Sequence, residues 1–371
     1  MNSRRILSVL IVALIVFAAL YLYQQMNKPT RNAASAEAAM PIGVPIAIEA
    51  PLGLPPVPVP ADNPPTVETI ALGRRLYYDP ILSVDNTVAC ASCHSPEYGF
   101  ADPRPVSEGV SKKTGTRNSP PVTNAAYFHV QFWDGRSPSL ENQAEGPVLN
   151  PVEMANGSLD EVVTRLNGSA SYREQFEKAW GPGPITYEKV EKSIASFERT
   201  VIAGDSPFDR WKYGHDEKAV SESVKRGFVV FTSPGKGNCA ACHLVGEKYA
   251  LFTDNKFHNV GVGVDAGEIQ DPGLFAVTHK ESDRGLFKTP SLRNIALTGP
   301  YMHDGSLRNL KEVVDFYIGA GNSNPNLDKE IHVLDFLSGQ ERGDLLAFLN
   351  SLTGKMPANL GPAEPLKQAQ K

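Results

Sequence analysis

The chain has 371 residues, of which 41% are hydrophobic and 21% are charged, so it can bury a core in about two domains. Its formal net charge is −5, which excludes a strongly basic surface, and we expect no nucleic-acid partner. The 31 glycines and 30 prolines favour turns and long ordered loops over a regular bundle or sheet.

The N-terminus predicts an export segment. Arg4 and Arg5 precede an uncharged apolar run over residues 6–23, which as a helix would span about 27 Å, close to the hydrocarbon thickness of a bilayer. The apolar core of a cleaved signal is shorter, about 7–15 residues. We therefore favour a signal anchor over residues 1–36, with a signal peptide cut near residues 34–36 as the alternative.

A proline-rich linker is expected at residues 37–65. Its proline density excludes a helix or a central strand. We therefore expect this linker to be extended or draped over the domain that follows.

Helical patterns recur along the rest of the chain. Residues 66–80 predict a helix with Thr66 as its N-cap, which precedes a cysteine motif at Cys90. Residues 219–231 predict a helix that precedes a second cysteine motif at Cys239. Each helix is followed by a turn region and a cysteine motif, which indicates a weak internal duplication. Five further amphipathic helices are expected, and strand signals are few; these helices cover residues 158–168, 171–180, 186–202, 307–321 and 338–352.

These patterns predict a mainly α fold with two domains and long irregular loops. The first domain covers residues 66–205 and the second covers residues 206–355, with the boundary near residues 204–207. A polar tail is expected at residues 356–371.

All four cysteines lie in two C-x-x-C-H motifs, Cys90-Ala-Ser-Cys93-His94 and Cys239-Ala-Ala-Cys242-His243. This spacing attaches c-type haem, because two thiols in one turn can form thioethers with the haem vinyl groups and the histidine can bind the iron. A thioredoxin-like motif or structural disulfides would not need the histidines, and a zinc site would have to pool ligands from distant motifs. Two copies without a spare cysteine favour two covalently bound haems.

With its motifs in this order, the chain resembles the bacterial dihaem cytochrome c peroxidase and MauG superfamily. The resemblance runs from about Leu72 to Leu352. It rests on LGRRLYYDPILS before CASCH, then on GTRNSPPVTNAAY, FWDGRSPSLENQAEGPVLNPVEM, ASFERTVIAGDSPFDRW, GNCAACH and FKTPSLRNIALTGPYMHDGS. It implies two cytochrome c-like haem domains in a periplasmic oxidoreductase, attached to the inner membrane if the N-terminal helix is retained.

The resemblance assigns peroxide chemistry to the haem on His94. Glu153 matches the family's acid–base glutamate, and Gln143 matches a glutamine of the same pocket; by itself, Glu153 would read as an exposed carboxylate. Residues 95–118 contain no histidine or methionine that could block this haem, so we expect it to be open when oxidised, as in MauG-like members. His129 is a nearby alternative ligand that we interpret as a packing or rim residue.

The haem on His243 would then transfer electrons. The resemblance places its second axial ligand at Tyr317, and Met302 is the competitor; tyrosinate lowers the potential of the iron, whereas methionine raises it. Trp133 matches a tryptophan between the two haems, where its ring could shorten electron hops.

The resemblance also implies one calcium ion between the domains, held by oxygen atoms of Asn118, Thr298 and Pro300. His303 and Arg293 are expected near haem propionates. Four histidines have no motif and are expected to be solvent-facing or structural: His215, His258, His279 and His332.

Three functions remain open on this sequence. The first is a peroxidase that reduces hydrogen peroxide to water with electrons from a small cytochrome c or copper protein. The second is a MauG-like enzyme that oxidises residues of a partner protein, which Tyr317 and the missing loop histidine favour. The third is a dihaem electron carrier, which the pocket around Gln143 and Glu153 argues against. A homodimer is left open.

Overall fold

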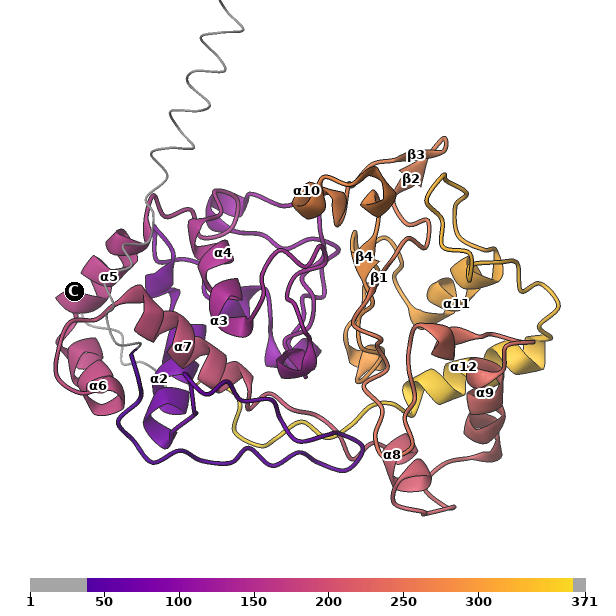
Figure 1. Ribbon diagram of the computed structural model, residues 1–371, viewed down its shortest axis with the longest axis horizontal. Coiled ribbons are helices and arrows are strands. Elements are labelled where there is room, and N and C mark those ends of the chain that lie inside the picture. Colours follow the sequence, from indigo (N-terminus) through magenta and orange to yellow (C-terminus); the bar gives the residue numbers. More distant parts are fainter. Residues whose placement is uncertain (1–38, 363–371) are drawn as a thin grey trace, which may run out of the picture. The chain divides into compact units, whose positions relative to one another are not determined.

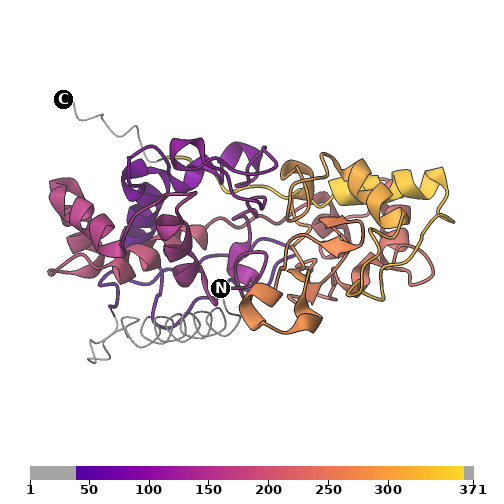
Figure 2. The same cartoon turned by 90° about the horizontal axis from the view of Figure 1, so that it is seen from above.

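A computed structural model describes residues 39–362, and from Met40 onwards these form one compact, mainly helical unit (Figures 1 and 2). The predicted export segment lies outside the described residues. No described helix has the length and apolar character needed to cross a bilayer. The α-helices are α2 (Val67–Tyr78), α3 (Leu140–Gln143), α4 (Glu145–Leu149), α5 (Leu159–Gly168), α6 (Ala170–Trp180), α7 (Tyr187–Glu198), α8 (Pro207–Lys212), α9 (Glu222–Thr232), α10 (Phe275–Thr278), α11 (Leu310–Ile318) and α12 (Gly339–Asn350).

The remaining regular elements are short. Strand β1 (Phe257–His258) pairs antiparallel with β4 (Phe287–Lys288), and β2 (Val264–Asp265) pairs antiparallel with β3 (Glu268–Ile269). The 3-10 helices are η1 (Pro80–Leu82), η2 (Cys90–Ser92), η3 (Pro96–Tyr98), η4 (Val110–Lys112), η5 (Ala125–Tyr127), η6 (Cys239–Ala241), η7 (Glu281–Asp283) and η8 (Ile295–Leu297).

The predicted helices form, with some corrected ends. Thr66 caps α2, and Ser158, Thr186 and Ser338 cap α5, α7 and α12. Helix α6 begins before the expected Ser171, because the Ser169 side chain accepts a hydrogen bond from the Tyr172 amide. Helix α11 begins only at Leu310, since Asn309 caps it in the same way.

One helix pair in each half of the chain packs closely through a glycine. Helix α2 packs on α7, and α9 packs on α12 (Figure 1). In the first pair, a Cβ atom on Gly73 would collide with the Ser193 carbonyl, and in the second, one on Gly227 would collide with the Asp344 carbonyl. Glycine therefore allows both close approaches. The expected internal duplication has a structural counterpart, although the domain boundary at residues 204–207 stays a prediction.

Each half has its own buried aromatic cluster. Tyr77, Phe100 and Phe197 pack together in the first half, and Leu360 from the C-terminal end joins them. In the second half, Phe208, Phe231, Phe252 and Phe348 are all no more than 1% exposed and form the centre of a larger cluster. Leu360 lies in the segment that was expected to be a polar tail, yet it is buried, and its carbonyl accepts a hydrogen bond from the Tyr78 hydroxyl.

The proline-rich linker is draped over both halves, as the sequence predicted. The Pro55 carbonyl accepts a hydrogen bond from the Tyr127 hydroxyl of the first half. The Gly53 carbonyl accepts bonds from the Ala250 amide and from the Arg293 guanidinium of the second half. In Figure 1 the indigo linker accordingly runs from the α2 region towards α8. We call residues 40–65 the strap.

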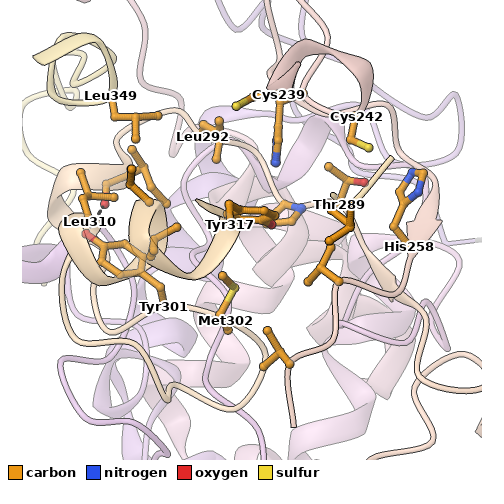
Figure 3. Close-up of a pocket in the computed structure, with 18 of the residues that line it drawn as sticks. Cys239, Cys242, His258, Thr289, Leu292, Tyr301, Met302, Leu310, Tyr317 and Leu349 are labelled. Carbon is orange, nitrogen blue, oxygen red and sulfur yellow. Dashed lines mark hydrogen bonds between the residues drawn. The ribbon is translucent and has the colours of Figure 1, made fainter. Parts of the chain in front are cut away.

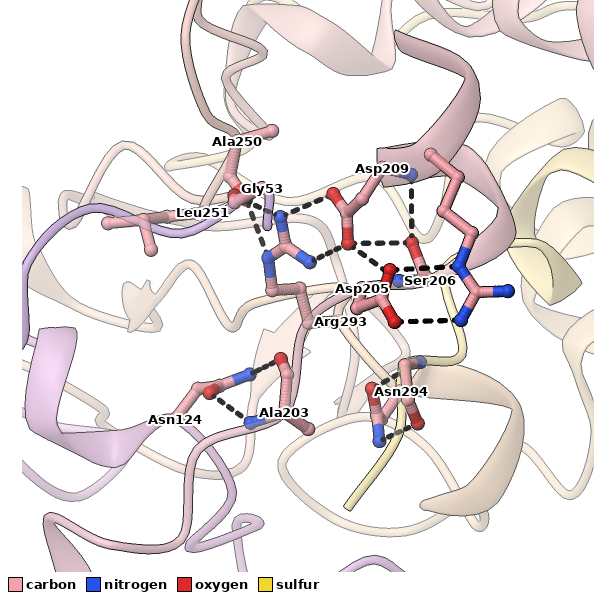
Figure 4. A network of polar contacts seen from close by, with 12 residues as sticks. Gly53, Asn124, Ala203, Asp205, Ser206, Asp209, Ala250, Leu251, Arg293 and Asn294 are labelled. Atoms are coloured by element: carbon pink, nitrogen blue, oxygen red, sulfur yellow. Dashed lines mark hydrogen bonds and ion pairs between the residues drawn. The ribbon is translucent and has the colours of Figure 1, made fainter. Parts of the chain in front are cut away.

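An ion pair beneath the strap is completely buried (Figure 4). The Arg293 guanidinium contacts both carboxylate oxygens of Asp209 at 2.9 Å, and its Nε donates to the Ala250 carbonyl at 2.7 Å. The two side chains are 1% and 0% exposed. The expectation that Arg293 approaches a haem propionate is therefore wrong, because its donors are used by Asp209, the strap and Ala250, and it lines neither of the two large cavities described below.

We expect Arg293→Gln to lower the free energy of unfolding by about 3–5 kcal/mol, because it leaves Asp209 buried without its counter-charge. Arg210→Gln is the matched control, since Arg210 pairs with Asp205 at the surface and such a pair contributes below about 1 kcal/mol. Chemical denaturation of the holoprotein, followed by circular dichroism, measures both. Equal losses in the two variants would contradict this account of the strap.

Candidate functional site

Each cysteine motif folds into a single tight turn. The first forms η2, where the His94 amide donates to the Cys90 carbonyl at 3.0 Å, and the second forms η6, where the His243 amide donates to Cys239 at 2.9 Å. All four cysteines are free of disulfides. Two thiols and one imidazole thus share each turn, which is the arrangement that covalent haem attachment needs.

A cavity of about 170 Å³ lies beside the first motif, and we call it the first cavity. His94, Gln143 and Glu153 line it together, as the sequence predicted. The His94 Nδ1 atom is buried and has no hydrogen-bond partner among residues 39–362, and burial lowers the pKa of His94 to about 4. The imidazole is therefore neutral, which is the form that ligates a metal.

The loop of residues 95–118 contributes small or polar groups to the first cavity: Ser107, Gly109, Gly115, Arg117 and Asn118. Among the described residues, this cavity has no second histidine in its lining. His129 is exposed and does not line it, in agreement with its interpretation as a rim residue. Met154, which the sequence reasoning did not consider, is buried and also lines the cavity.

Glu153 lies in the turn after α4 and is held by its neighbours. Its Oε1 atom accepts a hydrogen bond from the Asn150 side-chain amide at 2.6 Å. Burial raises the pKa of Glu153, while the charge of Arg136 and the bond from Asn150 lower it. A half-buried carboxyl with a raised pKa is suited both to accept and to return a proton.

A larger cavity, of about 220 Å³, lies beside the second motif, and we call it the second cavity. The His243 Nδ1 atom lies 2.8 Å from the Phe252 carbonyl, which fixes the ring and leaves Nε2 for a metal. Figure 3 shows Tyr317 and Met302 in this cavity, beneath Cys239 and Cys242. Burial raises the pKa of Tyr317, and the charges of the Cys239 and Cys242 thiols, which line the same cavity, raise it further.

Trp133 lines both cavities. Its indole N–H donates to the Asn118 carbonyl at 2.8 Å, and its own carbonyl accepts from the Lys288 amide of β4 at 2.8 Å. The ring is therefore held by a first-cavity loop and by a strand of the second half.

The three expected calcium ligands also lie near this junction. Asn118 lines both cavities, and Thr298 and Pro300 line the second. The Asn118 side-chain amide donates to the Arg104 and Pro105 carbonyls, which directs its nitrogen away from a cation. No ion is required by these contacts, and the calcium ion stays a prediction.

Three other histidines line the second cavity: His258, His303 and His332. His303 stacks on Phe287 with ring centroids 3.6 Å apart. His258 lies between Asp254 and Asp328; bonding to Cys242 and to these carboxylates raises its pKa to about 10. His332 is exposed at the rim, and His215 and His279 are exposed away from both cavities.

The sequence reasoning missed two buried ionisable residues at the cavities. Glu198, at the end of α7, lines the first cavity, and Lys288, on β4, lines the second. The Lys288 ammonium lies 3.4 Å from the Phe128 ring centre, and burial lowers its pKa to about 7. Glu198 occupies an inward position of an amphipathic helix, and that was the signal that could have identified it.

Comparisons with known proteins agree with this geometry. A family model described as di-haem cytochrome c peroxidase matches residues 67–217. The methylamine utilization protein MauG of Methylorubrum extorquens is 43% identical over 310 residues, which cover 83% of this chain and 85% of that protein. The cytochrome c551 peroxidase of Pseudomonas aeruginosa is 38% identical over 293 residues, covering 77% and 79%.

A solved structure is also similar. It is that of a MauG-like protein associated with microbial copper homeostasis, and it aligns with a TM-score of 0.75 at 34% identity. The alignment covers 85% of this chain and 97% of that chain.

We expect the double variant Cys90→Ala/Cys93→Ala to retain one covalently bound haem, because the second attachment turn is separate in the chain. Cys239→Ala/Cys242→Ala should likewise retain one. The haem-to-protein ratio after denaturation and acid extraction of unattached haem measures this. A ratio of two in either variant would show that the altered turn does not attach haem.

Proposed function

Because the chain belongs to the di-haem cytochrome c peroxidase family, we propose that it reduces hydrogen peroxide to water in the periplasm with electrons from a small redox protein. It is an oxidoreductase with two covalently bound haems, held through Cys90, Cys93, Cys239 and Cys242. The observation that carries the proposal is the first cavity, where Gln143 and Glu153 share one lining with His94.

In this proposal the protein's own groups perform the proton chemistry. The haem, when bound, supplies an iron that binds peroxide and accepts electrons. His94 would hold the iron from one side, and Glu153 would take a proton from one peroxide oxygen and return it to the other. Asn150 orients the Glu153 carboxyl, and the Gln143 amide helps to position the peroxide.

We further propose that Tyr317 would hold the second haem iron together with His243, since both line the second cavity. Its side chain lines the second cavity together with both attachment cysteines, and it belongs to the regular helix α11. Met302 lies in the same cavity and is the competing ligand. Trp133, in the lining of both cavities, would carry electrons between the haems.

A MauG-like function is the second candidate, in which the same oxidising power acts on residues of a partner protein. Tyr317 at the second cavity and the absence of a second histidine from the described first-cavity lining favour it. Donor oxidation and partner oxidation are distinguished by supplying peroxide with a reduced small cytochrome c or copper protein: rapid turnover supports the peroxidase.

Three further proposals concern other features of the protein. They are a calcium ion at Asn118, Thr298 and Pro300, anchoring by residues 6–23, and a homodimer.

We expect Glu153→Gln to lower kcat for peroxide-dependent oxidation of a reduced donor by about 10²–10⁴-fold, because the amide cannot shuttle a proton. Glu145→Gln is the matched control, since Glu145 lies on α4 outside the cavity lining. Stopped-flow and steady-state kinetics measure the effect. Full activity in Glu153→Gln would exclude its role as the acid–base group.

We expect Tyr317→Phe to change the absorption and EPR spectra of one haem and to raise its reduction potential, because the iron loses an anionic ligand. Met302→Leu should leave both spectra unchanged. Redox titration of each holoprotein measures the potentials. The reverse pattern, in which only Met302→Leu alters a haem, would assign the ligand to Met302.

A further inference from the structure

Glu198 is a buried acid in the first cavity to which the mechanism above gives no role. It is the last residue of α7, and its side chain lines the same cavity as His94 and Glu153. Ile194, one helical turn earlier, lines that cavity as well, so this face of α7 is directed into it. Glu198 is 5% exposed.

The surroundings of Glu198 do not satisfy a carboxylate. Its Oε2 atom is buried and has no hydrogen-bond partner among the described residues. Arg199, the next residue, pairs with Glu141, since its Nη1 lies 2.7 Å from Glu141 Oε1. An ionised carboxylate at Glu198 would be desolvated, and its Oε2 atom would have no hydrogen bond from the described residues, so burial favours the neutral acid.

The charged and titratable neighbours of Glu198 also affect the pKa of its carboxyl. Burial raises its pKa to about 8; Arg199 opposes the shift, and Glu141 adds to it. The charge of Glu198 raises the pKa of Tyr77 in α2 and of Cys90 in the attachment turn, and the charge of Glu153 also raises the pKa of Cys90. Once attached to haem, Cys90 is a thioether and carries no charge.

We propose that Glu198 is a second proton-transfer residue of the first cavity, where it holds a proton that peroxide reduction consumes. This rests on the proposed function. The reaction is H2O2 + 2 e⁻ + 2 H⁺ → 2 H2O. Glu153 moves a proton between the two oxygens and so supplies none of the two that are consumed.

The balance of this step is simple. The electrons come from the donor protein, and the O–O bond breaks as they are taken up. The O–H bond of Glu198 breaks and an O–H bond of product water forms, which leaves a carboxylate. Solvent returns that proton before the next turnover, and the other consumed proton comes from solvent.

The test uses the full holoprotein and the variant Glu198→Gln, with Glu188→Gln on the same helix as control, since Glu188 pairs with Lys192 outside the cavity. Infrared difference spectra between wild type and Glu198→Gln should contain the band of a protonated carboxyl, which disappears as the pH rises through about 8. A carboxylate band that persists across this range would overturn the proposal, whether or not the protein turns over.

Kinetics supply the second readout. In wild type, kcat should fall as the pH rises through about 8, because the acid is then lost. In Glu198→Gln, kcat should be about 10–100-fold lower and lack this fall, while the rate of peroxide binding to the oxidised protein is unchanged. Glu198→Asp should restore the pH-dependent limb. A Gln variant with the wild-type kcat and pH profile would overturn the role of Glu198.

The peroxidase function and the role of Glu198 are tested by different outcomes. If wild-type holoprotein does not oxidise any reduced donor with peroxide, the peroxidase is excluded, and the proton-donor role falls with it. If the wild type oxidises a reduced donor with peroxide but the Glu198 variants do not give the expected spectra and pH profiles, the peroxidase function stands and the proton-transfer role of Glu198 is wrong. A Gln variant that does not fold is replaced by Glu198→Asp, whose pH limb must be displaced from that of wild type.

Discussion

A c-type haem needs two thiols and one imidazole within a single turn of chain, and this requirement organises both halves of the protein. In each half, a helix containing a close-packed glycine precedes the attachment turn, and a cavity lies next to that turn. The strap connects the two halves, because Pro55 bonds to Tyr127 of the first half and Gly53 bonds to the buried Arg293 of the second.

The two cavities differ in what surrounds the metal-binding imidazole. The first has a proton-active glutamate, an amide and a second buried acid in its lining. The second has a tyrosine in the same lining as the attachment cysteines and is lined mainly by apolar groups. Trp133 lines both, so one aromatic ring is shared by the two cavities.

Much of the site could be predicted from the sequence, because covalent haem attachment leaves a local signature. The motifs, the helices before them and the shared lining of Gln143, Glu153 and Trp133 agree with the prediction. The ends of α6 and α11 were missed, since Ser169 and Asn309 compete as caps with residues that looked equally suitable. Local patterns rank such candidates poorly.

Other features depend on contacts between distant residues, and no local pattern encodes them. Arg293 lies in a string that the family resemblance associates with haem, yet its partner Asp209 is 84 residues away and removes it from the cavities. Leu360 belongs to a polar-looking tail but packs beside Tyr77. Glu198 lay inside the predicted helix of residues 186–202, whereas the fold ends α7 at Glu198 and places it in a cavity, where its Oε2 atom has no hydrogen-bond partner among the described residues.

The central claim is that the first haem is open to peroxide and the second is not. An EPR titration of the oxidised holoprotein with hydrogen peroxide tests this most directly. The account predicts one high-spin and one low-spin haem at the start, and loss of the high-spin signal with one equivalent of peroxide. Two low-spin haems whose signals do not respond to peroxide would contradict it and would indicate an electron carrier.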